Sequence, residues 1–254
     1  MVRPKKHLGQ HFLTDRKIAK RITDLLNAHD CDLILEIGPG EGVLSQFLAD
    51  RKEKKLKLIE IDPESVQYLR EKYGELSDSI VEDDFLTSDI GNYGNKIALI
   101  GNFPYNISSQ ILFKVLDYKD QVEEVVCMLQ KEVAVRLASG PGNKQYGILS
   151  VLLQTWYDVS IAFHVGPGAF FPPPEVHSTV MRLKRNSRRS MECNHELYKK
   201  IIKTSFNQRR KMLRNSLKSI LVNLDAEVPY LKKRPEELSV EQFIELCRSV
   251  EGVK

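Results

Sequence analysis

Short apolar runs alternate with amphipathic stretches along roughly the first 180 residues of the chain. Residues 32–37, 56–61, 96–100 and 122–129 each have the length and composition of a buried strand, and apolar residues at helical spacing follow each run. Pro63, just after the second run, suits the first position of a helix, where a missing N–H breaks no hydrogen bond. Strands that alternate with helices in this way predict βαβ units, and hence a mostly parallel sheet with helices on both faces.

The last part of the predicted sheet has a different pattern. Residues 149–165 are strand-like, and a further strand is predicted at about residues 178–183. The connection between them, residues 166–174, is rich in proline and glycine and is predicted to contain no helix. Because parallel strands need a long crossover, this short link favours an antiparallel strand at one edge of the sheet.

The pattern changes again in the C-terminal part of the chain. Residues 186–194 are polar and typical of a linker, and apolar residues then recur at helical spacing in 197–206 and 212–221. Residues 239–242 have the Ser-x-x-Gln form of a capping box ahead of a last helix. This pattern is typical of a small helical appendage without an internal repeat.

We therefore expect an α/β domain over residues 1–185 and a small all-helical domain over residues 186–254. The chain is 42% hydrophobic and 28% charged, which is typical of a soluble globular protein with a substantial core. No apolar run approaches the roughly 20 residues of a membrane span, and the basic start lacks the apolar core of a secretory signal. Four widely spaced cysteines without a Cys-x-x-Cys pair argue against a zinc site or a disulfide framework. We expect a cytoplasmic protein that binds no metal and no membrane.

The net charge of +4 conceals a strong asymmetry along the chain. Residues 3–21 carry a net charge of +6 and residues 184–234 a net charge of +11, whereas the body between them, residues 22–183, carries −10. Two basic flanks around an acidic body are expected when the flanks bind a polyanion and the middle carries the chemistry. The alternative is a pair of solvated, lysine-rich faces.

A glycine-rich loop, residues 36–42, follows the first predicted strand. Gly38 and Gly40 allow tight backbone turns and close approach of a ligand. The spacing resembles both dinucleotide-binding and S-adenosylmethionine-binding loops, and a purely structural strand-to-helix turn is the alternative. Glu36 suits a cationic ligand better than a pyrophosphate, and Val43 stands where a dinucleotide loop has a further glycine. These two details favour S-adenosylmethionine.

Acidic residues close the next two strands. Glu60 and Asp62 lie about 20 residues beyond the glycine loop, where a carboxylate can accept hydrogen bonds from both hydroxyls of a ribose. Strand alternation puts both side chains on one face, so either can be the acceptor. Residues 82–85 offer a carboxylate to the adenine amino group of the same cofactor, with a solvated acidic turn as the alternative.

Asn102-Phe103-Pro104-Tyr105 is the most specific motif of the chain. It follows a predicted strand at the carboxyl end of the sheet, where open α/β folds bind ligands. The amino nitrogen of adenine is a poor nucleophile, because its lone pair is delocalised into the ring. The Asn102 amide oxygen and the Pro104 carbonyl can accept hydrogen bonds from its two hydrogens, which favours a pyramidal nitrogen with its lone pair directed at a sulfonium methyl. Tyr105 can stack on a base that has left its own stack.

Two further segments suit a nucleic acid. Residues 170–176 form a stiff segment that can hold an aromatic face over a pocket, or a proline-rich linker with a buried Phe. Residues 206–211, with Arg214 and Lys218, predict a basic helix whose Arg and Lys side chains contact RNA phosphates without reading the sequence. A solvated helix face is the alternative for this segment.

Taken together, these motifs resemble the ribosomal RNA adenine N6,N6-dimethyltransferase family, the KsgA type. The resemblance extends from the Lys-His-Leu-Gly-Gln-His-Phe-Leu stretch at residues 6–13 to the C-terminal helices. It implies a Rossmann-like class I methyltransferase sheet and S-adenosylmethionine as the cofactor. Residues 206–217 look like the branch that acts on small-subunit rRNA, rather than the sister branch that methylates one adenine of large-subunit rRNA and gives antibiotic resistance.

The resemblance also implies roles for individual residues. The implied cofactor-binding residues are Gln10, His11, Leu13, Gly38, Gly40, Glu60, Asp84 and Asn102, with Glu60 rather than Asp62 at the ribose. The implied catalytic residues are Asn102, Pro104, Tyr105 and Phe170, with Phe170 and Tyr105 enclosing the target adenine. The residues expected to bind RNA are Arg209, Arg210, Lys211 and Arg214. Many members of the family have Asn where this chain has His11, and Leu is commoner at Phe103.

The expected function is S-adenosylmethionine-dependent dimethylation of two adjacent adenines in a hairpin near the 3′ end of small-subunit rRNA. The expected substrate is a ribosome assembly intermediate, and the protein is expected to be a monomer. A nicotinamide-dependent oxidoreductase is one alternative, but it leaves residues 102–105 and both basic flanks unexplained. A catalytically silent RNA-binding factor is another, although every side chain of the catalytic motif is present.

Overall fold

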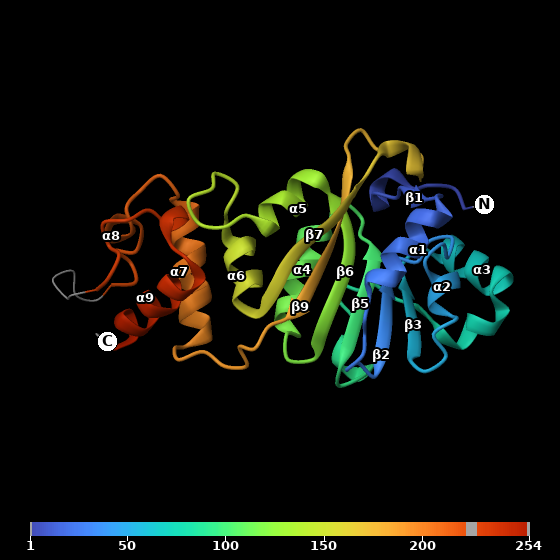
Figure 1. The fold of residues 1–254 in the computed structure, drawn as a ribbon, viewed down its shortest axis with the longest axis horizontal. Coiled ribbons are helices and arrows are strands. Elements are labelled where there is room, and N and C mark those ends of the chain that lie inside the picture. The colour runs from blue at the N-terminus through green and yellow to red at the C-terminus, as the bar shows by residue number, and fades with distance from the viewer. Residues whose placement is uncertain (1, 222–227, 253–254) are drawn as a thin grey trace. The chain divides into compact units, whose positions relative to one another are not determined.

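The computed structural model describes residues 2–221 and 228–252 (Figure 1). Its strands are β1 (Phe12–Leu13), β2 (Leu33–Ile37), β3 (Lys55–Glu60), β4 (Ile80–Glu82), β5 (Ile97–Asn102), β6 (Val122–Gln130), β7 (Tyr157–Val165), β8 (Phe170–Phe171) and β9 (Ser178–Arg185). Its α-helices are α1 (Arg16–Leu25), α2 (Ser45–Leu48), α3 (Pro63–Lys72), α4 (Ser108–Asp117), α5 (Lys131–Ala138), α6 (Ile148–Trp156), α7 (His195–Asn207), α8 (Leu213–Ser216) and α9 (Val240–Gly252). Short 3₁₀ helices are η1 (Lys6–Leu8), η2 (Gly74–Ser79), η3 (Ile90–Asn92), η4 (Pro167–Ala169) and η5 (Pro235–Glu237).

The main sheet has seven strands in the order β4-β3-β2-β5-β6-β9-β7. Strand β2 pairs in parallel with β3 and β5, β3 with β4, and β5 with β6, whereas β9 pairs antiparallel with β6. This confirms a mostly parallel sheet with an antiparallel edge. Since neighbouring parallel strands end on the same side, the segments after β2, β3, β4 and β5 come together at one edge.

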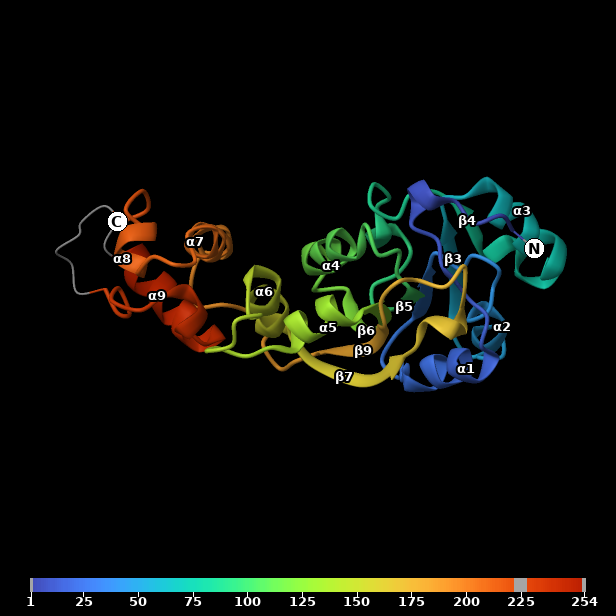
Figure 2. The ribbon, with the colours of Figure 1, turned by 90° about the horizontal axis from the view of Figure 1, so that it is seen from above.

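Helices cover both faces of the sheet, with α1 and α2 on one side and α4 on the other (Figure 2). The parallel strands are mostly apolar because both of their faces are largely buried, and all five residues of β2 are buried, Glu36 among them. Pro63 begins α3, as expected, and the preceding Asp62 caps the helix by accepting a hydrogen bond from the Glu64 N–H. Apolar side chains of α1 and α2, such as Ile22 and Leu48, complete the core on one face.

The expectation for residues 149–165 was wrong in its first half. This apolar run forms the helix α6 up to Trp156, and only then the strand β7. Six of the nine residues of α6 are buried. Most of its residues are apolar, and a short, largely buried helix of this composition is hard to distinguish from a buried strand by its sequence pattern.

The connection at residues 166–174 also has more structure than expected. Pro167 opens the short 3₁₀ helix η4, because its fixed φ angle suits a helix start, and the strand β8 follows directly. Strand β8 pairs antiparallel with β1 in a separate two-stranded sheet, with Leu13 opposite Phe170 and Phe12 opposite Phe171. This pairing joins the N-terminal segment to the segment that precedes β9.

The described chain forms two compact units. One comprises residues 1–134 and 158–185, and the other comprises residues 135–157 and 186–254. Residues 135–157, expected in the first domain, therefore belong with the C-terminal helices. The reason is that α6 supplies buried apolar and hydroxyl groups to them: Thr155 Oγ1 is 2.8 Å from the Tyr198 hydroxyl of α7.

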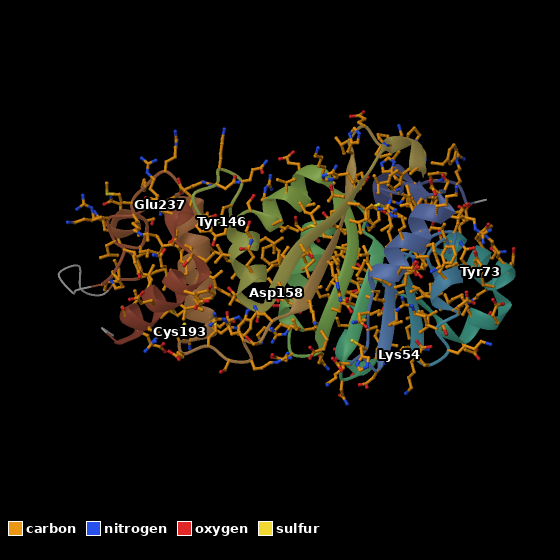
Figure 3. The ribbon with its side chains drawn as sticks, in the orientation of Figure 1. Lys54, Tyr73, Tyr146, Asp158, Cys193 and Glu237 are labelled. Atoms are coloured by element: carbon orange, nitrogen blue, oxygen red, sulfur yellow. The ribbon has the colours of Figure 1, made fainter. Side chains whose placement is uncertain are left out.

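The second unit has its own core. The ring of Tyr146, labelled in Figure 3, is fully buried and packs edge-on against Phe206 at 6.0 Å between ring centroids. The expected capping box opens α9: the Ser239 N–H donates to Gln242 Oε1 at 3.1 Å, and the Gln242 N–H donates to Ser239 Oγ at 3.3 Å. Of residues 212–221, expected to be helical, only Leu213–Ser216 form an α-helix, although Leu217 stays buried.

Candidate active site

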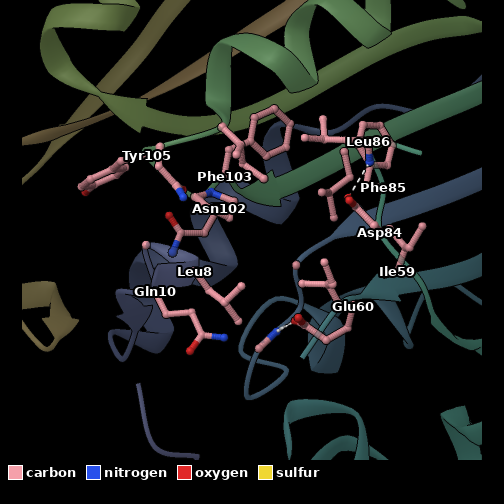
Figure 4. Close-up of a pocket in the computed structure, with 18 of the residues that line it drawn as sticks. Leu8, Gln10, Ile59, Glu60, Asp84, Phe85, Leu86, Asn102, Phe103 and Tyr105 are labelled. Carbon is pink, nitrogen blue, oxygen red and sulfur yellow. Dashed lines mark hydrogen bonds between the residues drawn. The ribbon is translucent and has the colours of Figure 1, made fainter. Parts of the chain in front are cut away.

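A cavity of about 260 Å³ lies at the carboxyl ends of β2, β3, β4 and β5 (Figure 4). Its walls are residues 7–12 of the N-terminal segment, residues 59–61, residues 83–86 and residues 102–107, together with part of the glycine loop. Each of these segments except the first leaves the sheet at its carboxyl edge, so the strand register itself assembles the cavity.

Two glycines give the cavity its floor. Gly38 and Gly40 have φ angles of +62° and +55°, which residues with a Cβ adopt only at a cost. A Cβ on Gly38 would meet no atom within 4 Å, so that side of the loop is open space, whereas a Cβ on Gly40 would lie 2.8 Å from the Phe12 ring. The loop is therefore shaped for close approach of a ligand at Gly38 and for tight packing at Gly40.

The structure separates the roles of Glu60 and Asp62. Glu60 lines the cavity, and its carboxylate accepts hydrogen bonds from the N–H groups of Gly40 at 3.0 Å and Asp62 at 2.9 Å. Burial raises the pKa of Glu60, although these backbone bonds oppose the shift. Asp62 lies outside the cavity walls, and its side chain accepts hydrogen bonds from Ser65 and from two residues of the N-terminal segment.

The N-terminal segment forms one wall of the cavity and is held by several polar contacts. Gln10 Nε2 donates to Asp62 Oδ2 at 3.1 Å, and Lys5 forms an ion pair with the same carboxylate. Gly9, at φ +64°, packs so closely on Asn106 that a Cβ there would lie 2.6 Å from its Oδ1. Fixing this wall keeps Gln10 and His11, both expected to bind the cofactor, at the edge of the cavity.

Asn102 has one paired and one unpaired polar atom. Its Nδ2 donates to the His11 carbonyl at 2.8 Å, which sets the orientation of the amide. Its Oδ1 is buried and has no hydrogen-bond partner among the residues that the structure describes. Buried acceptors are nearly always paired, so an orphaned one in a cavity wall suits a donor on a ligand. Asn102 therefore presents a fixed acceptor.

The residues that follow Asn102 continue the wall. The Pro104 carbonyl accepts a hydrogen bond from the Ile107 N–H at 3.2 Å and keeps a second lone pair for another donor. The Tyr105 hydroxyl is 2.6 Å from Ser178 Oγ, and burial raises the pKa of this phenol. The His11 ring stacks on Tyr105, with ring centroids 5.4 Å apart and an interplanar angle of 28°.

Three residues of the sequence-derived hypothesis lie away from the cavity. Leu13 and Phe170 are each 5% exposed and pack in the core between the sheet and α1. Neither lines the cavity, because the two residues face each other in the β1–β8 pair with their side chains turned toward this core. Their roles remain predictions. Glu36 is buried below the glycine loop, where it accepts a hydrogen bond from Ser45 Oγ at 2.7 Å and burial raises its pKa to about 8. It does not reach the ligand space.

Asp84 borders the cavity as expected, and its Oδ1 accepts a hydrogen bond from the Leu86 N–H at 2.8 Å (Figure 4). Two apolar neighbours, Ile61 and Phe85, also line the cavity and were missed from the sequence. Ile61 is 49% exposed and is one of five exposed large apolar side chains among the described residues. In the sequence, the one indication that these two residues line the cavity is their position: Ile61 directly follows Glu60, and Phe85 directly follows Asp84.

The basic residues expected to bind RNA lie in the second unit, but not on one helix. Helix α7 ends at Asn207, and residues 208–210 form turns before α8. Arg210, Lys211 and Arg214 are exposed. Arg209 is half-buried: its guanidinium donates to the Asn143 carbonyl at 3.1 Å and lies 3.8 Å from Glu236.

Within residues 2–221 and 228–252, no helix is long and apolar enough to cross a membrane. The same residues contain no group of three His, Cys, Asp or Glu side chains that could hold a metal ion.

The cofactor implied by the motifs fits this cavity. S-adenosylmethionine needs room at the glycine loop, a carboxylate for its ribose and flat apolar walls for its adenine, and Gly38, Glu60 and the pair Ile61 and Phe85 meet these needs. The strand order, the glycine loop and the acidic strand ends around one cavity define a class I S-adenosylmethionine-dependent methyltransferase.

The family follows from comparison with known proteins. A family model described as ribosomal RNA adenine dimethylase matches residues 1–251, and the chain belongs to this family. The ribosomal RNA small subunit methyltransferase A of Parabacteroides distasonis is 53% identical over 249 residues, which cover 97% of this chain and 93% of that protein. The protein of the same name from Porphyromonas gingivalis is 54% identical over 250 residues, or 96% of each chain.

Two solved structures share the fold. A dimethyladenosine transferase from Plasmodium falciparum has a TM-score of 0.80 and 23% sequence identity, covering 93% of this chain and 96% of that one. The 23S rRNA methyltransferase ErmE has a TM-score of 0.71 and 27% identity, covering 94% of this chain and 99% of that one. Both matches extend over nearly the full length of the chain.

Proposed function

We propose that this rRNA adenine dimethylase acts on two adjacent adenines in a hairpin near the 3′ end of small-subunit rRNA, within a ribosome assembly intermediate. The choice of the small subunit is supported by relatives with 53% and 54% identity that carry the name small subunit methyltransferase A. The large-subunit enzyme ErmE is only 27% identical. We expect the protein to act as a monomer in the cytoplasm.

The observation that carries the proposed chemistry is the buried, unpartnered Oδ1 of Asn102 among the described residues. This oxygen accepts one hydrogen of the target amine, and the Pro104 carbonyl accepts the other. With both hydrogens held, the nitrogen lone pair points out of the plane of the base. Tyr105 stacks on the extruded base and keeps it in register with these acceptors.

The residues proposed to hold the cofactor surround the same cavity. Gly38 leaves room for it, the Glu60 carboxylate accepts from its ribose, and Asp84 accepts from its adenine amine. Bound S-adenosylmethionine supplies an electrophilic methyl group. After transfer, the alkylated nitrogen loses a proton readily, so no strong base is required among the cavity residues.

Arg210, Lys211 and Arg214 are proposed to contact the phosphates of the substrate RNA, in agreement with their exposure. Such contacts position RNA without selecting a sequence. Arg209 has a structural role instead, because its guanidinium is engaged by Asn143 and Glu236.

The test is transfer of labelled methyl groups from S-adenosylmethionine to purified small ribosomal subunits that lack the modification. We expect dimethyladenosine on nucleoside mass spectrometry, at two adjacent positions near the 3′ end of the rRNA. Label found only in large-subunit RNA would assign the protein to the other branch. Cofactor binding without any methylated adenosine would refute the enzymatic function.

A further inference from the structure

The first 21 residues carry seven Lys and Arg side chains, three of them at positions 3, 5 and 6 and four on the helix α1. Lys5 is engaged with Asp62 and Glu64 at the cavity wall. Four others belong to α1, where Arg16, Lys17, Lys20 and Arg21 are all exposed. The basic character of the N-terminal flank is therefore concentrated on one helix.

Helix α1 separates its two faces sharply. Ala19, Ile22 and Thr23 are buried against the sheet. At 100° per residue the four basic residues fall within about 140° of arc on the opposite side, so they form one face. Rise along the axis is about 1.5 Å per residue, so these charges span about 8 Å. We call Arg16, Lys17, Lys20 and Arg21 the α1 basic face.

Most of this face has no counter-charge of its own. Lys20 pairs with Asp24 one turn further along. Among the described residues, no Asp or Glu lies within 4.0 Å of the charged groups of Arg16, Lys17 or Arg21. The adjoining residues 22–183 carry a net charge of −10, so a cationic face here is an exception within an acidic body.

One of these cations is also held in place. The Arg21 guanidinium lies 3.9 Å from the centroid of the Phe163 ring on β7. Stacking on an aromatic face orders the planar group while its N–H edges stay free to bind a phosphate. The side-chain entropy that Arg21 would lose on binding is therefore already partly lost.

Helix α1 begins close to the carboxyl ends of the parallel strands (Figure 1). Phe12 lines the cavity, and α1 starts four residues later at Arg16. Between them, the Thr14 N–H donates to the Ala169 carbonyl at 2.8 Å, which ties this turn to the segment that carries Phe171. Phe171 is 51% exposed and lies opposite the cavity-lining Phe12 across the β1–β8 pair, so this segment also offers an exposed aromatic ring.

We propose that the α1 basic face binds the phosphate backbone of the rRNA strand that flanks the target adenine. This proposal rests on the proposed function, since it places a second part of the same substrate. Cations next to the cavity hold the strand, and the exposed Phe171 ring offers a stacking surface along the path to Tyr105. The contact is independent of sequence, so it contributes affinity rather than choice of base.

The test compares two triple variants with the same change in charge. The first, Arg16→Gln, Lys17→Gln and Arg21→Gln, removes the unpaired cations of the α1 basic face. The control, Lys52→Gln, Lys55→Gln and Lys96→Gln, removes three exposed cations at the amino ends of the strands, at the edge of the sheet opposite the cavity. Binding of labelled small-subunit rRNA is measured at salt concentrations from about 0.05 to about 0.3 M, alongside cofactor affinity.

We expect the α1 variant to bind rRNA about 10- to 100-fold more weakly at about 0.1 M salt, with a log–log salt slope shallower by about two. The control variant should stay near the wild type. Cofactor affinity and the rate at saturating subunits should be unchanged in both, which also shows that the variants are folded. Equal losses in the two variants would overturn the proposal, because net charge alone would then explain them, and so would a wild-type slope in the α1 variant. If the wild type binds rRNA through α1 but methylates no adenine, only the proposed function fails.

Discussion

Replacing Asn102 with alanine removes two contacts that the structure separates by atom. The Oδ1 of Asn102 is the unpartnered acceptor in the cavity wall, and Nδ2 donates to the His11 carbonyl at 2.8 Å. The first contact is proposed to act on the target amine as it reacts, whereas the second only holds the N-terminal wall. The two losses should therefore appear in different measurements.

The expected magnitudes follow from the kind of bond that is lost. Removing one preorganised polar group from a transition state typically costs on the order of 10²–10³ in rate, or about 3–4 kcal/mol. The neutral hydrogen bond to the His11 carbonyl contributes only about 0.5–1.5 kcal/mol, so cofactor affinity should fall by about tenfold or less. Asn102→Asp is the matched variant: it keeps an acceptor but brings a carboxylate oxygen against that carbonyl, so it should bind the cofactor more weakly than Asn102→Ala.

The assay is single-turnover methyl transfer to unmodified small subunits, with cofactor affinity measured by calorimetry on the same preparations. An Asn102→Ala enzyme that transfers methyl groups at close to the wild-type rate would refute the role of Oδ1. A variant that no longer binds the cofactor would show instead that Asn102 acts mainly through the N-terminal wall.

Three further predictions concern groups in the fold that supports the cavity. Asp62→Asn should raise KM for the cofactor with little change in kcat, because Asp62 holds Gln10 at 3.1 Å without lining the cavity; a loss of kcat at saturating cofactor would contradict this. Burial raises the pKa of Glu36 from 4.5 to about 8, so the folded state retains a proton that the unfolded chain releases, and the free energy of unfolding falls as pH rises between these values. Glu36→Gln should therefore gain stability relative to the wild type across that window in urea unfolding, and a pH-independent difference would count against the buried acid. Gly40→Ala should lower the free energy of unfolding by at least about 2 kcal/mol, through its positive φ and its clash with Phe12, and an unchanged melting temperature would disprove the close approach.

Much of the fold could be predicted because its signals are local. Parallel strands buried on both faces are mostly apolar runs, and the runs at 32–37 and 122–129 agree with β2 and β6 to within a residue. The capping box at 239–242 could also be predicted from the sequence, since both of its hydrogen bonds lie within four residues. Helix α6 was not predicted, because a short, mostly apolar run has a similar sequence pattern in a buried helix and in a buried strand.

The basic run after Phe206 shows where local spacing is insufficient. Its apolar periodicity predicts a helix through Lys211, but α7 ends at Asn207. The next residues form turns instead, in which the Arg209 and Lys211 N–H groups donate to the Phe206 and Gln208 carbonyls, three residues earlier. The Leu213 and Arg214 N–H groups then donate to the Lys233 and Leu231 carbonyls, about 20 residues away, so they do not extend the same helix.

The kinds of residue at the active site can be predicted from the sequence, because each motif consists of a few adjacent residues. These motifs are the glycines at a strand end, the carboxylates at the ends of strands and the Asn-x-Pro-Tyr turn. Tertiary structure alone decided which of their atoms face the cavity. It turned Glu60 inward and made Asp62 a helix cap, buried Phe170 behind the β1–β8 pair, and left Asn102 Oδ1 free by pairing Nδ2 with a carbonyl 91 residues away. The orientation of a polar side chain is set by whichever partner satisfies its other atoms, and that partner comes from a distant part of the chain.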